Sequence, residues 1–232
     1  MDELIGRKAD GPFELVIFDL DGVLVDSEPI SSRVTAAALS EAGVAISAAE
    51  VCERFLGTST AAMLRTIEAE HRCRLPATFQ ETLRSRVLKA FELELVPVPG
   101  VAAVLDALAL PRCVASSSHP ERIRRSLQLT GLLGHFAPHL FSATMVAHGK
   151  PAPDLFLLAA ARMSADPARC LVVEDSEVGV RAGKAAGMTI AGFAGASHLR
   201  PEAHAPRLQA AGADIVLTEI SALRGVVERG LV

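Results

Sequence analysis

Short runs of apolar residues without polar alternation recur along the chain, which is typical of strands buried on both faces of a parallel sheet. They predict strands at residues 15–18, 112–115, 139–142, 170–174, 189–193 and 214–217. Apolar positions at helical spacing predict helices between them, at residues 101–109, 121–129, 154–163 and 178–186. A loop and a further helix are expected between the last two strands. Strands that alternate with helices imply right-handed crossovers, so we expect an α/β fold with a doubly wound, Rossmann-like parallel sheet.

A long segment with a helical pattern, residues 29–96, separates the first two predicted strands. Apolar residues from position 34 to 42 recur at helical spacing and stop at Gly43, and later groups near Met63 and Val87 indicate further helices. We therefore expect a small all-helical domain inserted into the α/β domain. The predicted organisation is a flexible lead-in at residues 1–12, an α/β core at 13–28 and 97–232, and the helical domain at 29–96.

Composition narrows the class of partner. Half of the 232 residues are apolar, and 23 basic against 27 acidic residues give a net charge of −4, so no basic field favours nucleic acid or an anionic membrane. No apolar run approaches the ~20 residues of a membrane-spanning helix, and the first residues lack the layout of a signal peptide. The four cysteines lie far apart and indicate neither a zinc cluster nor disulfides. We expect a cytoplasmic protein, a monomer or weak homodimer.

Two carboxylates, Asp19 and Asp21, stand where the first strand should end. An ionised carboxylate is costly in apolar surroundings unless a cation or several donors meet it. Because open α/β sheets place ligand sites at the carboxyl ends of their strands, a divalent cation is the simplest partner for these acids. Gly22 then lets the backbone turn away sharply. A solvated turn is the alternative, since Asp-x-Asp is also common in loops and calcium sites.

Polar residues also follow three later segments. Residues 116–118 precede a helix, where hydroxyl and N–H groups can face an anion or cap the helix. Lys150 lies in a rigid Gly-Lys-Pro loop and can neutralise phosphate oxygens and a carboxylate, or remain a surface lysine. Asp154 is expected to cap the helix that starts there. Glu174 and Asp175 end another strand and can bind a cation, or lie near the positive end of the following helix.

Four segments in this order, residues 19–28, 116–120, 148–154 and 172–176, resemble the motifs of the haloacid dehalogenase-like phosphohydrolases. The resemblance implies that the protein hydrolyses a small phosphomonoester, such as a sugar phosphate or sugar-acid phosphate. Asp19 would be the nucleophile that forms an aspartyl-phosphate, and Asp21 the general acid/base. The helical domain resembles the small cap of the family's first subclass, which closes over the site.

The same resemblance assigns the remaining candidate residues. Ser116, the N–H of Ser117 and Lys150 would hold the transferring phosphate. Glu174 would be a metal ligand or would orient metal-bound waters. The implied cofactor is Mg²⁺, and four residues would hold it: Asp19, Asp21 through its backbone carbonyl, Glu174 and Asp175.

Two other functions stay open. A phosphomutase of the β-phosphoglucomutase type is similar, but its cap His would fall at Ser31 and its cap Lys and Arg near Leu56 and Thr60, and these departures favour hydrolysis. A non-catalytic module that binds a phosphorylated ligand is the second alternative. Dehalogenation is not expected, because haloacid dehalogenases lack the second carboxylate found at Asp21. Residues 54–60 resemble the substrate loop of the cap, whereas Arg33 and Arg54 can equally lie on solvated helix faces.

Overall fold

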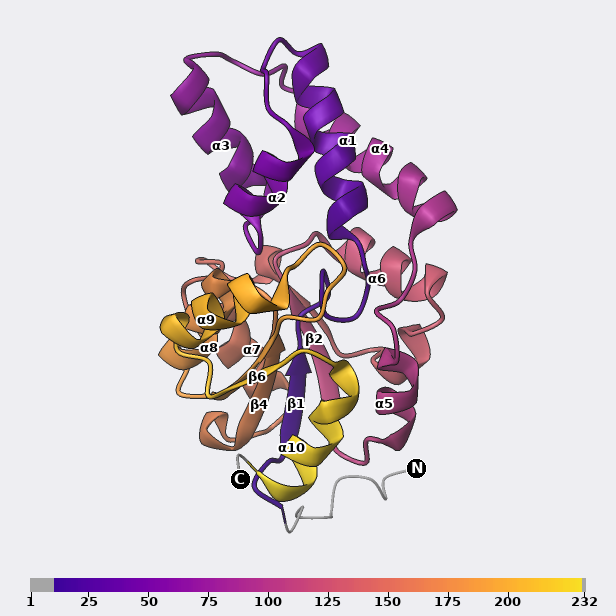
Figure 1. Ribbon diagram of the computed structural model, residues 1–232, viewed down its shortest axis with the longest axis vertical. Coiled ribbons are helices and arrows are strands. Elements are labelled where there is room, and N and C mark those ends of the chain that lie inside the picture. Colours follow the sequence, from indigo (N-terminus) through magenta and orange to yellow (C-terminus); the bar gives the residue numbers. More distant parts are fainter. Residues whose placement is uncertain (1–10, 231–232) are drawn as a thin grey trace.

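The computed structural model describes residues 11–230 and has a six-stranded sheet flanked by helices (Figure 1). The strands pair in the order β3-β2-β1-β4-β5-β6, and every pair is parallel. Their bounds are β1 (Leu15–Phe18), β2 (Arg112–Ser116), β3 (Leu140–Ser142), β4 (Cys170–Glu174), β5 (Thr189–Phe193) and β6 (Ile215–Leu217). The predicted doubly wound parallel sheet is thereby confirmed. The strand order reverses beside β1, where such sheets form a crevice at the carboxyl ends of the strands.

Side chains of β1 alternate between two hydrophobic clusters, one on each face of the sheet. Leu15 and Ile17 belong to one cluster, Val16 and Phe18 to the other, and all four are fully buried. This double burial explains why the strand shows no polar alternation. The helices that cover the sheet are α5 (Val101–Ala107), α6 (Pro120–Leu129), α7 (Asp154–Arg162), α8 (Glu177–Ala185), α9 (Pro201–Ala211) and α10 (Leu223–Arg229). Short 3₁₀ segments lie at η1 (Leu133–His135), η2 (Ala143–Met145), η3 (Pro167–Arg169) and η4 (Ile220–Ala222).

The helical insert lies above the carboxyl ends of the strands in Figure 1. It contains α1 (Glu28–Glu41), α2 (Ala48–Phe55), α3 (Thr60–His71) and α4 (Phe79–Glu94), as the all-helical prediction required. The two chain segments that join it to the sheet run side by side, because the N–H of Asp26 bonds to the carbonyl of Val96 and that of Val98 to Leu24. The division at residues 28/29 and 96/97 stays a prediction.

Several predicted bounds differ from the structure by one or two residues, and two helices were not predicted. The first helix after the insert ends at Ala107 rather than at 109, because the backbone of Leu108 is already extended. Helix α2 has 8 residues, of which only Val51 is buried, so the sequence shows no helical repeat of apolar positions there. Helix α10 has only 7 residues, with two of them buried, and gives no clear repeat either. The predicted lead-in, residues 1–12, lies outside the described residues up to position 10. No helix within residues 11–230 is both long and apolar enough to cross a membrane.

Candidate active site

Three of the predicted site residues meet between the ends of β1 and β4. The register pairs Phe18 with Val173, which places Asp19 beside Glu174 at the same edge of the sheet. Lys150 reaches both acids from its loop, with Nζ 2.6 Å from Asp19 Oδ1 and 2.9 Å from Glu174 Oε2. Only 1% of the Lys150 side chain is exposed, so the solvated surface lysine is excluded. Burial opposes its charge, but the two acids outweigh that effect and raise the pKa of Lys150.

Asp175 joins Asp19 and Glu174 in a buried acidic cluster whose oxygens lie within 4.8 Å of one another. Burial and then Glu174 raise the pKa of Asp19 to about 8, and burial, Glu174 and Asp19 raise that of Asp175 well above its ordinary value. Among the described residues, Lys150 is the only Lys or Arg paired with these acids, so two negative charges are left without a partner once all three carboxylates are ionised. Asp175 Oδ2 has no hydrogen-bond partner among those residues. The cluster therefore fits a divalent metal ion.

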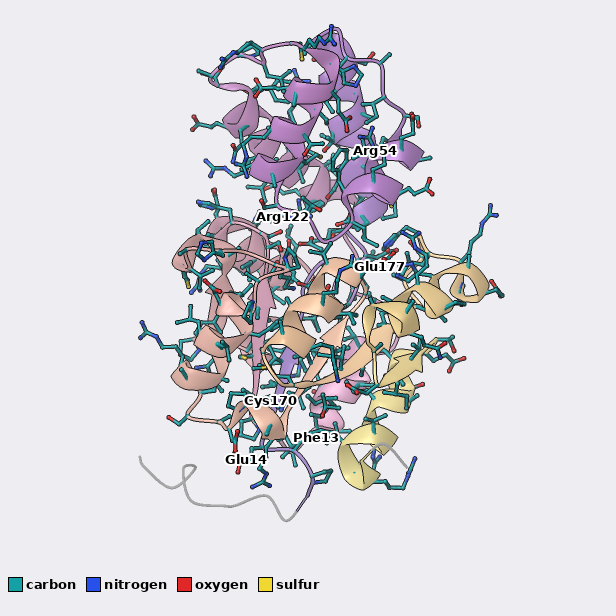
Figure 2. The ribbon with its side chains drawn as sticks, turned by 90° about the vertical axis from the view of Figure 1, so that its left-hand side faces the viewer. Phe13, Glu14, Arg54, Arg122, Cys170 and Glu177 are labelled. Atoms are coloured by element: carbon teal, nitrogen blue, oxygen red, sulfur yellow. The ribbon has the colours of Figure 1, made fainter. Side chains whose placement is uncertain are left out.

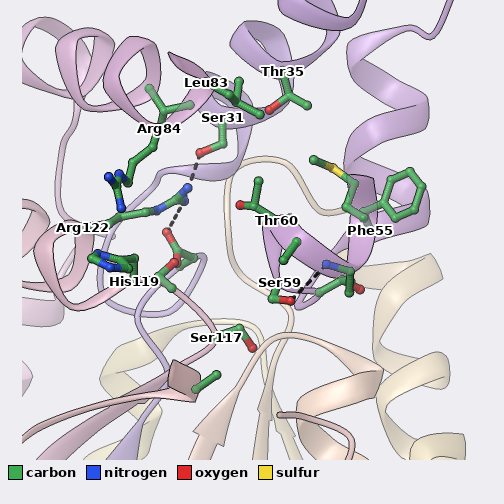
Figure 3. Close-up of a pocket in the computed structure, with 18 of the residues that line it drawn as sticks. Ser31, Thr35, Phe55, Ser59, Thr60, Leu83, Arg84, Ser117, His119 and Arg122 are labelled. Atoms are coloured by element: carbon green, nitrogen blue, oxygen red, sulfur yellow. Dashed lines mark hydrogen bonds and ion pairs between the residues drawn. The ribbon is translucent and has the colours of Figure 1, made fainter. Parts of the chain in front are cut away.

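Asp21 has a different environment, because donors surround its carboxylate. It accepts hydrogen bonds from Ser27 Oγ at 2.6 Å, from Ser118 Oγ at 2.7 Å and from Arg122 Nη2 at 2.5 Å. Burial raises the pKa of Asp21, but the Arg122 guanidinium and the two hydroxyls outweigh it and hold that pKa below its ordinary value. The same Arg122 nitrogen donates to Ser31 Oγ of the insert at 3.0 Å, as Figure 3 shows. Asp21 is therefore an ionised acceptor at the junction of insert and sheet.

The serines that follow β2 line the same cavity as Asp19 and Lys150. Ser116 is buried, and its Oγ accepts from the N–H of Ser118 at 3.0 Å. Ser117 is the next residue, and its Oγ donates to the carbonyl of Gly57 at 3.1 Å. All the predicted catalytic and phosphate-binding residues are thus brought together at one site.

Two capping predictions are settled by the helix starts. Helix α6 is capped by His119, whose Nδ1 accepts from the N–H of Glu121 at 3.4 Å, which leaves the Ser118 hydroxyl for Asp21. The prediction that Asp154 caps α7 is wrong, because it is already the first helical residue. Its Oδ2 lies 3.1 Å from His148 Nδ1 instead, so it braces the loop that carries Lys150.

A cavity of about 580 Å³ lies between the insert and the carboxyl edge of the sheet, within the size range of small-molecule sites. Asp19 and Lys150 line it on the sheet side, and Figure 2 shows Arg122 at the junction. Half of the insert residues that line it are polar: Ser31, Thr35, Thr58, Ser59, Thr60, Gln80 and Arg84 are among them, several of them labelled in Figure 3. The cavity suits a small polar ligand.

The predicted substrate loop, residues 54–60, is only partly a loop. Its first two residues end α2, and Thr60 begins α3. The tip reaches the sheet, since a Cβ on Gly57 would lie 2.3 Å from Ser176 Oγ. Arg54 and Arg33 do not line the 580 Å³ cavity; they pair with Glu70 at 2.5 Å and Glu94 at 2.6 Å, as expected of solvated helix faces.

Sequence reasoning missed three charged residues that line this cavity. Arg122 packs over the ring of Phe91 while it binds Asp21, and Arg84 lies beside it in Figure 3. Burial and then Asp21 raise the pKa of Glu28 to about 7. The arginines gave no signal, because they are two of many in the sequence and neither lies in a motif.

Comparisons with known proteins agree with this geometry. The family model of the haloacid dehalogenase-like hydrolases matches residues 13–187. The 6-phosphogluconate phosphatase of Escherichia coli K12 is 34% identical over 82% of this chain and 87% of its own. A haloacid dehalogenase-like protein of unknown function from Agrobacterium tumefaciens is 41% identical, covers 93% of this chain and 97% of its own, and has a TM-score of 0.79.

A hydrolase of the same family from Deinococcus radiodurans, solved with bound phosphate and sodium, is 34% identical. It covers 94% of this chain and 96% of its own, with a TM-score of 0.73. The match to the family model and the similarity along most of the chain agree with the geometry, in which three motifs line one cavity and the fourth joins them through the contact of Glu174 with Lys150. The chain therefore belongs to the haloacid dehalogenase-like hydrolases.

Proposed function

We propose that the protein is a Mg²⁺-dependent phosphatase that hydrolyses a small phosphomonoester through an aspartyl-phosphate on Asp19. One observation carries this proposal: Lys150 is buried between Asp19 and Glu174, at the floor of a cavity of about 580 Å³. A buried ammonium between two carboxylates at a ligand site suits the binding and transfer of a phosphoryl group.

In the first step, Asp19 attacks the phosphorus, and the bond from phosphorus to the ester oxygen breaks. For this step Asp21 must first take up a proton, from solvent or from a substrate that binds as the monoanion, and it passes that proton to the ester oxygen, so the product leaves as an alcohol. The Ser116 hydroxyl, the Ser117 N–H and the Lys150 ammonium bind the phosphoryl oxygens while charge develops on them.

In the second step, water attacks the phosphorus of the aspartyl-phosphate, and the bond to Asp19 breaks to release phosphate. Asp21 takes the proton of the attacking water. Hydrogen bonds from Arg122 and two serines keep Asp21 ionised in the free site, which is the form that this step requires. Positioned acid/base help contributes about 10²- to 10⁴-fold, so the phosphate-binding groups must supply much of the remaining acceleration.

Mg²⁺ would be held by Asp19, Glu174, Asp175 and the backbone carbonyl of Asp21. When bound, it supplies the positive charge that lets a carboxylate approach a phosphate dianion. The two negative charges that the acidic cluster gains in excess of Lys150 once its three carboxylates are ionised support a divalent ion at this place.

The substrate that we propose is a sugar phosphate, and within that class a sugar-acid phosphate. Arg84 lines the cavity but makes only long contacts, 4.0 Å to Glu81 and 3.7 Å to Glu121. Three other arginines of the insert form tight pairs at 2.6, 2.5 and 2.6 Å: Arg33 with Glu94, Arg54 with Glu70 and Arg86 with Glu41. Arg84 is therefore available for a substrate carboxylate, and the relative from E. coli is named for 6-phosphogluconate, which carries one.

We further propose that the insert, residues 29–96, acts as a cap that closes over the core at residues 13–28 and 97–232. The Ser117 to Gly57 hydrogen bond supports this role, because it joins the core to the insert beside the phosphate-binding residues. Closure would exclude water, and opening would release product. We propose a cytoplasmic enzyme, monomeric or weakly dimeric, with no nucleic-acid partner.

The proposal is tested by Mg²⁺-dependent release of phosphate from p-nitrophenyl phosphate, followed by a panel of sugar, sugar-acid and hexitol phosphates. Wild-type turnover should need Mg²⁺, and Asp19→Asn should abolish it. Asp26→Asn is the matched control, since Asp26 lies in the same motif but binds Ser197 and does not line the cavity. Isomerisation of a sugar phosphate that depends on a bisphosphate activator would indicate a mutase instead. Phosphate binding without turnover would contradict the enzyme.

A further inference from the structure

Asp175 is flanked by two histidines from a segment that contains none of the four motifs. His198 lies between β5 and α9, and His204 lies in the first turns of α9. Figure 1 shows this stretch, coloured orange to yellow, running over the end of the sheet nearest the insert. The mechanism above uses neither residue.

His204 holds the main chain of Asp175. The ring is buried, and its Nε2 lies 2.6 Å from the backbone carbonyl oxygen of Asp175. A carbonyl oxygen only accepts, so Nε2 carries the proton and donates. This hydrogen bond fixes the backbone at the turn where β4 ends and α8 begins.

His198 faces the side chain of Asp175. Only 4% of its side chain is exposed, and its Nε2 lies 3.7 Å from Asp175 Oδ2. Neither ring nitrogen of His198 has a hydrogen-bond partner among the described residues, and neither does that carboxylate oxygen. Unpaired buried polar atoms that face each other are costly, so their placement calls for a functional reason.

Gly22 makes this approach possible. A Cβ at that position would lie 1.9 Å from Asp175 Oδ2 and 3.2 Å from His198 Cε1. The glycine of the first motif therefore has two requirements: a φ of +78°, and space for the facing carboxylate and imidazole.

Asp175 needs such support more than the other two acids of the cluster. Lys150 binds both Asp19 and Glu174, and Ser176 donates to Glu174 as well. No comparable hydrogen bond within residues 11–230 orients the Asp175 carboxylate. Partners that orient a metal ligand typically change metal affinity by about 10- to 100-fold.

We propose that His198 and His204 are positioning residues that fix Asp175 for the divalent cation. His204 acts through the main chain of Asp175, and His198 Nε2, 3.7 Å from the Asp175 carboxylate, donates to it when the two side chains close to hydrogen-bond distance around the cation. This inference rests on the proposed metal site. It predicts a change in Mg²⁺ affinity that can be measured without substrate.

The test is a calorimetric titration of the purified full-length chain with Mg²⁺ alone. His198→Leu and His204→Leu keep apolar volume but remove the donors, and each should weaken Mg²⁺ binding about 10-fold or more. His204→Gln should restore affinity to within about 3-fold, because its amide nitrogen can take the place of Nε2, whereas the shorter His204→Asn should not. His139→Leu, at an exposed position before β3, is the control and should bind as the wild type does.

Melting temperatures in metal-free buffer separate positioning from simple destabilisation. Folded His198→Leu and His204→Leu variants with wild-type Mg²⁺ affinity would refute the proposal. If the leucine variants do not fold, the Gln and Asn pair at position 204 decides, and equal affinities in that pair refute it. A wild type that binds no Mg²⁺ would overturn the cofactor proposal as well, whereas wild-type binding with unaltered variants overturns only the role of the histidines.

Discussion

The Nζ atom of Lys150 lies 2.6 Å from Oδ1 of Asp19, although 131 positions separate the two residues in the sequence. Parallel strands bring their carboxyl ends to one edge of the sheet, and the loop before α7 delivers the lysine there. The free site thus holds its proposed nucleophile against a buried ammonium, which can shift its contacts to phosphate oxygens.

Lys150→Met removes the only Lys or Arg that pairs with the acidic cluster among the described residues. We expect phosphate release to fall by about 10²-fold or more, because phosphoryl charge is no longer neutralised. Buried acids left without a partner should also lower the free energy of unfolding by about 3–5 kcal/mol in metal-free buffer. Chemical denaturation and steady-state kinetics measure both effects.

Lys184→Met is the matched control for that substitution. Lys184 pairs with Asp214 at 2.8 Å, but 40% of its side chain is exposed, so its loss should cost about 1 kcal/mol or less. Comparable losses in the two variants would contradict the special position of Lys150.

Asp19→Asn should stabilise the metal-free protein at pH 8. The folded-state pKa of Asp19 is raised from 3.8 to about 8, so the folded state retains a proton that the unfolded state loses between these values. Asp19 therefore makes the wild type less stable as the pH rises through this window, and asparagine has no proton to lose. We expect similar melting temperatures near pH 4 and a variant that melts at least about 2–4 °C higher at pH 8. Equal pH dependence of wild type and variant would contradict this account.

Mg²⁺ binding should become tighter from pH 5 to pH 8 and should release protons. The pKa values of Asp19 and Asp175 are raised in the free site, so the cation must displace protons from these carboxylates at lower pH. Titration calorimetry in two buffers with different ionisation enthalpies measures the released protons. A binding enthalpy that does not depend on the buffer would contradict the prediction.

Arg84→Gln should change the choice among substrates. We expect KM to rise about 10-fold or more for a sugar-acid phosphate and to change little for a neutral sugar phosphate, because only the former offers a carboxylate to this guanidinium. Arg86→Gln, two residues along α4, removes an arginine that is already paired with Glu41 at 2.6 Å. An equal rise in KM for both substrate classes would show that Arg84 does not bind the carboxylate of the substrate.

The sequence predicts the strands, and the place of the main candidate residues at the strand ends, because their causes are local. A strand that is buried on both faces shows as an uninterrupted run of apolar residues. Asp19 and Asp175 are the residues that come directly after two of these strands. The order of the motifs then predicts that these acids meet.

Other residues of the site depend on contacts that spacing along the chain cannot reveal. Arg122 meets Asp21 across 101 positions, and its helix gives no sign of which arginine will face the cavity. His198 and His204 reach Asp175 from a loop and a helix start that carry no recognisable pattern. Asp is a common residue at helix caps, but α7 begins at Asp154 itself. The cap position is therefore occupied by Pro153.

Chemical trapping tests the central claim most directly. A reaction with Mg²⁺ and substrate is quenched in acid near steady state, reduced with borohydride and mapped by peptide mass spectrometry. An aspartyl-phosphate should appear as a reduced side chain at Asp19, and it should be absent without Mg²⁺ or without substrate. Turnover with reduction at no residue, or at another acid such as Asp21 or Asp175, would contradict the proposed nucleophile.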